Sequence, residues 1–291
     1  MKRYPLHTFS IAAYDPAGPS WGVAVASKFL AAAALVSWAR ARAGAIATQA
    51  LARVSYGPDG LDLMAGGLSA SEALERLLAG DPEREHRQIG LVDAQGGTAA
   101  FTGSECMAWA GHHTGAGYTC QGNILTGPET LDAMAAAFES APGDLGARLV
   151  AALAAGDAAG GDRRGKQSAA VLVVTPGGGY GGDNDRYLDL RVDDDPDPVG
   201  RLAGLLKLHQ LYFGQTDPAR RIPIDAALAR ELQALLARLG YYQGPVDGAW
   251  DGPTIDAFWA FVGTENLEER WTPADAGRLD PVILDFIRER F

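Results

Sequence analysis

Residues 8–27 read TFSIAAYDPAGPSWGVAVAS and contain two short runs of alternating residues that are separated by a turn. The two runs are residues 8–14 and 21–27, and residues 15–19 (DPAGP) lie between them. Alternation of β-branched, aromatic and small apolar residues favours strands, and clustered proline and glycine favour a turn. The segment therefore predicts an antiparallel hairpin at the start of the fold.

The following residues, up to about 192, alternate further strands with helices. Strands are predicted at residues 43–50, 89–94, 98–102, 168–175 and 188–192. Helices are predicted after Ser69, which forms a capping box with Glu72, after Pro128, and over residues 145–155, ending before Gly156. Because tight turns join neighbouring strands, we expect antiparallel sheets rather than a doubly wound parallel sheet. The predicted class is α+β, a layered sandwich with helices that cover the sheets.

The last third of the chain has a different pattern. An amphipathic helix is predicted to end near Phe213, and residues 214–223 have the composition of a linker. Asp225 is the expected N-cap of a further helix with a regular leucine stripe, and Gly240 is expected to end that helix in the left-handed conformation. We therefore predict a larger domain followed by a small all-helical domain. The predicted boundaries are residues 1–215 and 222–291.

Composition limits the classes of partner. The chain has 291 residues, 47% hydrophobic and 21% charged, which is enough to bury a substantial core. Lys+Arg 25 against Asp+Glu 36 gives a formal net charge of −11, so no nucleic-acid partner is expected. No apolar stretch is long enough for a membrane span, and Met1–His7 is not followed by an apolar signal segment, so we expect a cytoplasmic protein. We also expect a homo-oligomer, as is common for acidic sandwich proteins of this size.

The candidate metal-binding and phosphate-binding motifs of the sequence are incomplete. Residues 160–167 (GGDRRGKQ) nearly form a phosphate-binding loop, but Gln167 stands where a hydroxyl is required. His112 and His113 are adjacent on an extended segment and so point to opposite faces, which disfavours a zinc site with Cys106 and Cys120. We predict no metal and no cofactor, and we expect both cysteines to be reduced.

Several motifs, spread in order over about the first three quarters of the chain, are shared with a known family. They are residues 8–11 (TFSI), 22–29 (GVAVASKF), 38–41 (WARA), 47–50 (ATQA), 55–58 (SYGP), 121–123 (QGN), 161–168 (GDRRGKQS), 184–187 (NDRY) and 189–194 (DLRVDD). On these motifs the chain resembles the domain of unknown function 1028 family, which is itself similar to the N-terminal-nucleophile (Ntn) hydrolases. The resemblance implies a four-layer α/β/β/α sandwich, in agreement with the order of strands and helices.

An Ntn hydrolase attacks a carbonyl carbon with a Thr, Ser or Cys side chain, and its own α-amino group, of pKa about 8, accepts the proton. Thr8 begins the first predicted strand and is the candidate nucleophile, with Lys28 and Arg40 as cations that would lower its pKa. Because Met1–His7 precede it, the mechanism requires cleavage of the bond between His7 and Thr8. A threonine at this position is also explained by strand propensity alone, so both interpretations stay open.

Other residues of these motifs are candidates for contacting a substrate. The backbone around Thr48 and Gln49, or the amide of Asn123, would donate hydrogen bonds to an oxyanion. Three further residues are candidates for binding a carboxylate or amide substrate: Arg163, Asn184 and Arg186. Turn chemistry and ion pairs at a sheet edge would explain those three residues equally well.

The C-terminal segment carries a second resemblance. Its motif comprises residues 232–233 (LQ), 239–242 (LGYY), 246–248 (VDG) and 257–258 (AF), with Gly244, Trp250 and Thr254. On this motif the segment resembles a small peptidoglycan-binding module, which implies a glycan partner. Tyr241, Tyr242 and Trp250 would stack on sugars, pack in the core of the module or form a dimer contact, and we favour packing.

These observations predict an enzyme of the amidohydrolase type. The expected reaction is hydrolysis of a small amide bond, either non-peptide or in a short peptide, with Thr8 as nucleophile after processing. The alternative is a catalytically silent protein that binds a small molecule or a cell-wall fragment in the same pocket. An intact N-terminus, with no acylation by amide-directed electrophiles, would favour that alternative.

Overall fold

A computed structural model describes residues 8–214, 216–275 and 277–291. The chain divides into two compact units, the first ending at Leu206 and the second running from Lys207 to Phe291. The helix α6 (Pro198–Phe213) contains this boundary. Our predicted domain limits, residues 1–215 and 222–291, stay a prediction. No helix of the described residues is long and apolar enough to cross a membrane.

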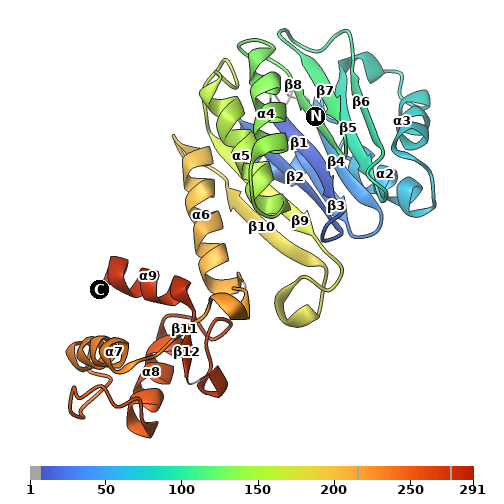
Figure 1. Cartoon of the computed structure of the whole chain (residues 1–291). Coiled ribbons are helices and arrows are strands. Elements are labelled where there is room, and N and C mark those ends of the chain that lie inside the picture. The colour runs from blue at the N-terminus through green and yellow to red at the C-terminus, as the bar shows by residue number, and fades with distance from the viewer. Residues whose placement is uncertain (1–7, 215, 276) are drawn as a thin grey trace. The chain divides into compact units, whose positions relative to one another are not determined.

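The first unit contains two antiparallel sheets (Figure 1). The larger sheet has the order β10-β9-β2-β1-β8-β7, and the smaller has the order β3-β4-β5-β6. The strands of the larger sheet are β1 (Thr8–Asp15), β2 (Ser20–Ser27), β7 (Gly111–Gly115), β8 (Tyr118–Gly122), β9 (Ser168–Val174) and β10 (Arg186–Val192). Those of the smaller sheet are β3 (Ser37–Arg40), β4 (Gly44–Ala50), β5 (Arg87–Asp93) and β6 (Thr98–Thr102).

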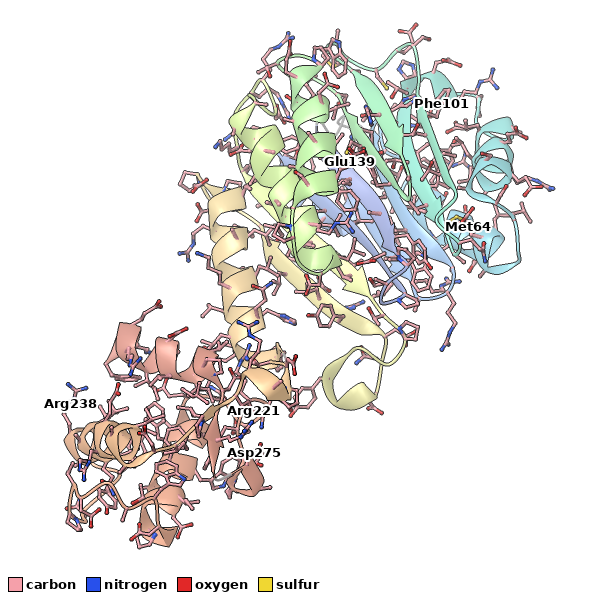
Figure 2. The ribbon with its side chains drawn as sticks, in the orientation of Figure 1. Met64, Phe101, Glu139, Arg221, Arg238 and Asp275 are labelled. Atoms are coloured by element: carbon pink, nitrogen blue, oxygen red, sulfur yellow. The ribbon has the colours of Figure 1, made fainter. Side chains whose placement is uncertain are left out.

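The two sheets face each other, and helices pack on their outer faces. Val25 of β2 and Val92 of β5 belong to one apolar cluster between the sheets. The helices α4 (Glu129–Ser140) and α5 (Leu145–Ala158) cover the outer face of the larger sheet (Figure 1). The helices α2 (Tyr56–Ala65) and α3 (Ala70–Ala79) cover the smaller sheet, where Met64 and Phe101 pack in one cluster (Figure 2). A short helix, α1 (Ala33–Val36), precedes β3.

The predicted mixed α+β class is confirmed, and so are several local signals. Thr8 pairs with Ser27 in the first hairpin. The Ser69 side chain accepts a hydrogen bond from the Glu72 backbone, and the Glu72 carboxylate accepts one from the Ser69 backbone, so the capping box is present. Both cysteines are free thiols, as expected.

The predicted end of the helix before Gly156 is wrong. The helix α5 continues through Gly156 to Ala158. A Cβ atom on Gly156 would lie 2.6 Å from Cγ of Met134 on α4. The glycine therefore allows two helices to approach closely and does not end one.

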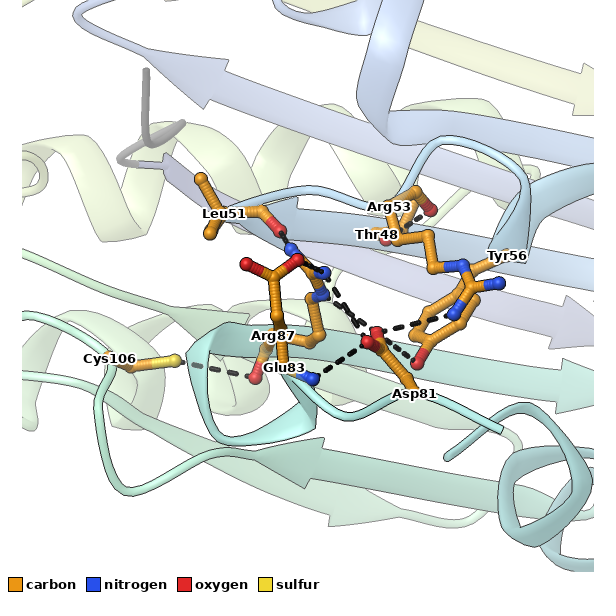
Figure 3. A network of polar contacts seen from close by, with 8 residues as sticks. All are labelled: Thr48, Leu51, Arg53, Tyr56, Asp81, Glu83, Arg87 and Cys106. Atoms are coloured by element: carbon orange, nitrogen blue, oxygen red, sulfur yellow. Dashed lines mark hydrogen bonds and ion pairs between the residues drawn. The ribbon is translucent and has the colours of Figure 1, made fainter. Parts of the chain in front are cut away.

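A buried ion-pair network ties the end of β4 to α2 and β5 (Figure 3). Asp81 accepts hydrogen bonds from Arg87 Nε and from the Tyr56 hydroxyl, both at 2.8 Å, and Arg87 also donates to Glu83 at 2.8 Å. Burial alone would raise the pKa of the Asp81 carboxyl, but the hydrogen bonds from Arg87 and Tyr56 outweigh it and hold this pKa below its usual range. The network fixes the chain immediately after Ala50.

The second unit is helical, with α7 (Ala226–Arg238), α8 (Gly252–Thr264) and α9 (Pro281–Arg290). The two-residue strands β11 (Ile222–Pro223) and β12 (Arg278–Leu279) pair, so the module is not entirely helical; strands this short leave no alternating pattern to predict. Asp225 caps α7, and Gly240 has φ +86°, both as predicted. Short 3₁₀ helices complete the described chain: η1 (Arg84–His86), η2 (Tyr180–Gly182), η3 (Pro218–Arg220) and η4 (Pro273–Asp275).

Aromatic packing holds the second unit together. Tyr242 is buried, and Tyr241 and Trp250 pack against the same cluster. The ring of Trp250 lies edge-on to Phe258, with centroids 5.6 Å apart. The predicted packing role of these residues is therefore confirmed. An ion pair of 2.7 Å between Arg221 and Asp275 lies within the same unit (Figure 2).

Candidate functional site

Thr8 lies at one end of β1, on the face of the larger sheet that is turned toward the smaller one. It is fully buried, and its hydroxyl donates to Oγ of Ser27, its partner in β2, at 3.3 Å. Its carbonyl oxygen accepts hydrogen bonds from Gln49 Nε2 at 3.2 Å and from the Asn123 backbone N–H at 3.1 Å. The fold thus brings together three of the predicted site residues, Thr8, Gln49 and Asn123, from three separate segments.

A network of uncharged side chains continues from Thr8 between the sheets. Gln49 Nε2 also donates to Gln88 Oε1 at 2.8 Å, and Gln49 Oε1 accepts from the Ser10 hydroxyl at 2.7 Å. Gln121 Nε2 donates to Ser10 Oγ at 2.7 Å, and Asn123 Nδ2 donates to Gln88 Oε1 at 3.0 Å. All five side chains are buried. Because an unpaired buried amide is costly, these mutual bonds fix each side chain in one orientation.

Sequence reasoning missed Ser10, Gln88 and Gln121 as members of the site. A signal for them exists in the two-residue period of strands. Ser10 lies two residues after Thr8 and therefore shares its face. Gln88 and Gln121 lie opposite Gln49 and Ser10 respectively, and partners in an antiparallel pair share a face.

Gly90 makes room for this network in the middle of β5. A Cβ atom at this position would lie 1.9 Å from Gln121 Oε1 and 2.3 Å from Thr119 Oγ1. The Thr119 hydroxyl itself donates to Gln121 Oε1 at 2.9 Å. The absence of a side chain at Gly90 is therefore required for the two sheets to share these polar groups.

A cavity of about 150 Å³ lies beside Asn123, and Thr8 itself is not among its lining residues. Its lining includes Asn123, which donates to the Thr8 carbonyl, and Ala50, which follows Gln49. Glu105 and Cys106 also line the cavity. Burial raises the pKa of the Cys106 thiol to about 11, so the thiol is neutral near pH 7 and a weak nucleophile.

Neither predicted cation is hydrogen-bonded to Thr8 in the described part of the chain. Lys28 lies in the bend just after β2, and its ammonium donates to the Lys166 carbonyl at 3.1 Å. Arg40 pairs with Asp62 at 2.8 Å. Arg40 lies opposite Gly44 in β4. Gly44 is five residues from Gln49, so the two positions are about 17 Å apart along the strand.

The remaining predicted substrate residues are distributed over three places. Thr48 lies on the outer face of the smaller sheet, where its hydroxyl donates to the Arg53 carbonyl at 3.4 Å. Arg163 is exposed and donates through Nη2 to the Leu125 carbonyl at 3.2 Å. Asn184 is exposed in the turn before β10, where its Oδ1 accepts from the Arg186 backbone at 2.8 Å.

Arg186 lies far from Thr8. Along β9, Ser168 marks the end at which Thr8 and Ser27 lie, whereas Arg186 pairs with Val174, about 20 Å further on. Its guanidinium forms an ion pair with Asp189 at 3.1 Å.

The side chains of the network around Thr8 are uncharged, and this limits the chemistry that the site can perform. Among the described residues, no group of three or more His, Cys, Asp or Glu side chains is placed to hold a metal ion. The Thr8 hydroxyl donates to another hydroxyl, that of Ser27, which is a poor base at neutral pH. The segment Met1–His7, whose removal would free the Thr8 α-amine, lies outside the described residues.

Comparison with known proteins covers both units. Residues 8–202 match the family described as "Family of unknown function (DUF1028)", and residues 212–287 match "Putative peptidoglycan binding domain". Among solved structures, protein SPO2555 from Silicibacter pomeroyi, titled with the same DUF1028 family, is 32% identical with a TM-score of 0.64. The match covers 73% of this chain and 92% of that one. No curated protein matches the chain.

Proposed function

We propose, for a chain that belongs to the DUF1028 family of unknown function, that the first unit is an amide hydrolase of the Ntn type with Thr8 as its nucleophile. Two facing sheets with helices on their outer faces are the arrangement that such an enzyme requires, and this supports a four-layer sandwich. The substrate class is a small amide, because the cavity beside Asn123 measures only about 150 Å³.

The observation that carries the proposal is how firmly Thr8 is held. Its carbonyl accepts two hydrogen bonds, from Gln49 and from the Asn123 backbone, while its hydroxyl lies beside Ser27. The two bonds to the carbonyl hold the backbone at this position, and the hydroxyl beside Ser27 is what the threonine side chain adds. A residue held in this way keeps its hydroxyl and its backbone nitrogen in a constant position, and this supports a catalytic role.

The proposed reaction begins with hydrolysis of the bond between His7 and Thr8, which leaves a carboxylate on His7 and an α-amine on Thr8. Thr8 Oγ1 then attacks the carbonyl carbon of the substrate, and its proton passes to the α-amine. Breakdown of the tetrahedral intermediate transfers that proton to the leaving amine and leaves an ester on Thr8. Water hydrolyses the ester, which restores the hydroxyl and releases the acid.

Asn123 is the proposed oxyanion donor, because it lines the cavity and lies beside the Thr8 carbonyl. Gln49 is better assigned to positioning, because its Nε2 already has three acceptors: the carbonyls of Thr8 and Gln121 and the Gln88 side chain. In this mechanism the α-amine alone acts as base, and neither Lys28 nor Arg40 takes part.

Intact mass and N-terminal sequencing of the purified chain test the processing step. The expected product begins at Thr8. A second preparation, released at Thr8 from an N-terminal fusion by a protease, tests the chemistry independently of natural processing. Both are assayed against a panel of N-acyl amino-acid p-nitroanilides and with an amide-directed electrophile.

The matched variants are Thr8→Ala, Thr8→Ser and Thr130→Ala. Thr8→Ala is expected to lose activity by more than about a thousandfold, whereas Thr8→Ser keeps a hydroxyl and retains part of it. Thr130 is equally buried but lies on α4, so its replacement controls for general destabilisation. A chain that begins at Thr8, remains folded and is neither acylated nor active would refute the mechanism and favour a binding protein.

For the second unit we propose binding of a peptidoglycan fragment, supported by its family match. Because Tyr242 and Trp250 pack in the core, we assign the sugar contact to the exposed tryptophan of this unit, Trp259, which is 37% exposed. Co-sedimentation with purified peptidoglycan tests this proposal. Trp259→Ala is expected to reduce the bound fraction, and unchanged binding would remove Trp259 from the site.

A further inference from the structure

A groove of about 250 Å³ lies where the larger sheet extends beyond the smaller one. β3, the edge strand of the smaller sheet, packs on β2 and β9, and β10 lies one strand further out. The inner face of β10 therefore borders an open space. The residues that line the groove include Ser37, Ala39, Leu172, Arg186, Asp189 and Arg191.

The strand register directs polar side chains of β10 into this groove. Asp189 pairs with Leu172 and Arg191 pairs with Ala170 in β9. Paired residues share one face of a sheet, and both Leu172 and Ala170 pack in the cluster between the sheets. Asp189 and Arg191 consequently face the groove and not the helices that cover the other side of the sheet.

Of the two arginines that line the groove, Arg191 has the looser ion pair. Arg186 and Asp189 form a close ion pair at 3.1 Å. Arg191 Nε lies 3.9 Å from the Asp193 carboxylate, which is longer than a hydrogen bond. The Arg191 side chain is 39% exposed, and its guanidinium has the planar fork that binds a carboxylate through two parallel hydrogen bonds.

A buried hydroxyl on the opposite wall is the second, independent observation. Ser37 lies two residues before Ala39, which packs between the sheets, so both side chains share the inner face of β3. Ser37 Oγ is buried and has no hydrogen-bond partner among the described residues. A buried hydroxyl without a partner is rare, because it loses its bonds to water and gains nothing in return.

We propose that this groove binds a small organic carboxylate that carries an apolar group. The Arg191 fork binds the carboxylate, the Ser37 hydroxyl turns into the groove and donates to the same carboxylate, and Ala39 and Leu172 contact the apolar part. Arg186, neutralised by Asp189, borders the groove without competing for the ligand. The site is distinct from Thr8, since β10 lies three strands from β1, about 14 Å away. The proposal does not rest on the hydrolase activity, because its readout is binding.

Isothermal titration calorimetry of the full chain tests this proposal with two probes of similar shape. N-acetyl-L-leucine has a carboxylate and no ammonium group, and L-leucinamide has an ammonium group and no carboxylate. We expect N-acetyl-L-leucine to bind at millimolar concentration and L-leucinamide not to bind. Equal binding of the two probes, or no heat from N-acetyl-L-leucine, overturns the proposal.

Three substitutions locate the site. Arg191→Gln removes the charge and the fork and is expected to weaken binding about tenfold or more, and Ser37→Ala is expected to weaken it a few-fold. Arg76→Gln removes an exposed arginine from α3 and is expected to change nothing. If Arg191→Gln binds as the wild type does, the groove is not the site. Arg191→Lys, which keeps the charge, is expected to be intermediate and serves as the second variant if the glutamine variant unfolds.

Discussion

Replacing Gly90 by alanine tests whether the amide network between the sheets is rigid. The new Cβ atom would lie 1.9 Å from Gln121 Oε1 and 2.3 Å from Thr119 Oγ1, distances at which one partner must move. Gly90 pairs with Ala47 and with Ala100 in the middle of the smaller sheet, so its backbone is held on both sides. We therefore expect the Gln121 side chain to be displaced.

The hydrogen bonds of Gln121 determine how much stability Gly90→Ala should lose. Its amide nitrogen donates to the Ser10 hydroxyl at 2.7 Å and to the Ser10 carbonyl at 3.1 Å, and its oxygen accepts from Thr119 at 2.9 Å. At about 1 kcal/mol for each bond, with about 1 kcal/mol for overpacking, Gly90→Ala should lower the free energy of unfolding by about 4 kcal/mol. That is a large part of the total for a domain, about 5–15 kcal/mol.

Urea denaturation followed by circular dichroism measures the change. Gly204→Ala is the matched control, because a Cβ atom on this α6 residue meets nothing within 4 Å; it is expected to stabilise by up to about 1 kcal/mol. In the double variant with Gln121→Ala the clash is relieved, so its destabilisation should be smaller than the sum of the two single effects. A loss below about 1 kcal/mol for Gly90→Ala would refute the reasoning, since Gln121 would then move without losing its partners.

Three further predictions follow from the described contacts. Asp81→Ala leaves the buried Arg87 without its main partner and should cost about 3–5 kcal/mol at pH 7 in urea denaturation. Because the pKa of Asp81 is lowered in the folded state, its contribution is complete above the unfolded value of about 3.9 and is lost as pH falls below it, so the difference between variant and wild type should shrink in acid. Cys106, with a pKa of about 11, should react with iodoacetamide at pH 8 far more slowly in the folded chain than in urea, as followed by mass spectrometry. Gln233→Leu removes the bonds from Gln233 to the Ala249 carbonyl and from the Gly248 N–H, and calorimetry should show a lower melting temperature for the second unit alone.

Local signals were sufficient for most of the fold. The turn at residues 15–19, the capping box at Ser69 and the left-handed Gly240 each depend on a few neighbouring residues, and each was predicted. The strands β3, β7 and β8 and the helices α1 and α2 were missed. β7 is GHHTG, which lacks an apolar face, and α2 contains Gly57, Pro58 and Gly60. Gly57 is required there because a Cβ atom would lie 2.3 Å from the Trp38 ring, a contact between segments that no local pattern reveals.

The candidate site was only partly predictable, because motif membership says which residues matter and not which face they occupy. Thr48 and Gln49 are neighbours in one motif, yet Gln49 points between the sheets and Thr48 points toward α2. These assignments follow from the two-residue period once the inner face of one strand is known. The position of Arg186 does not follow from it, since it depends on which strands are neighbours and on how far along β9 the pairing runs. A residue's place in a motif is therefore weak evidence for a shared site until the strand order is known.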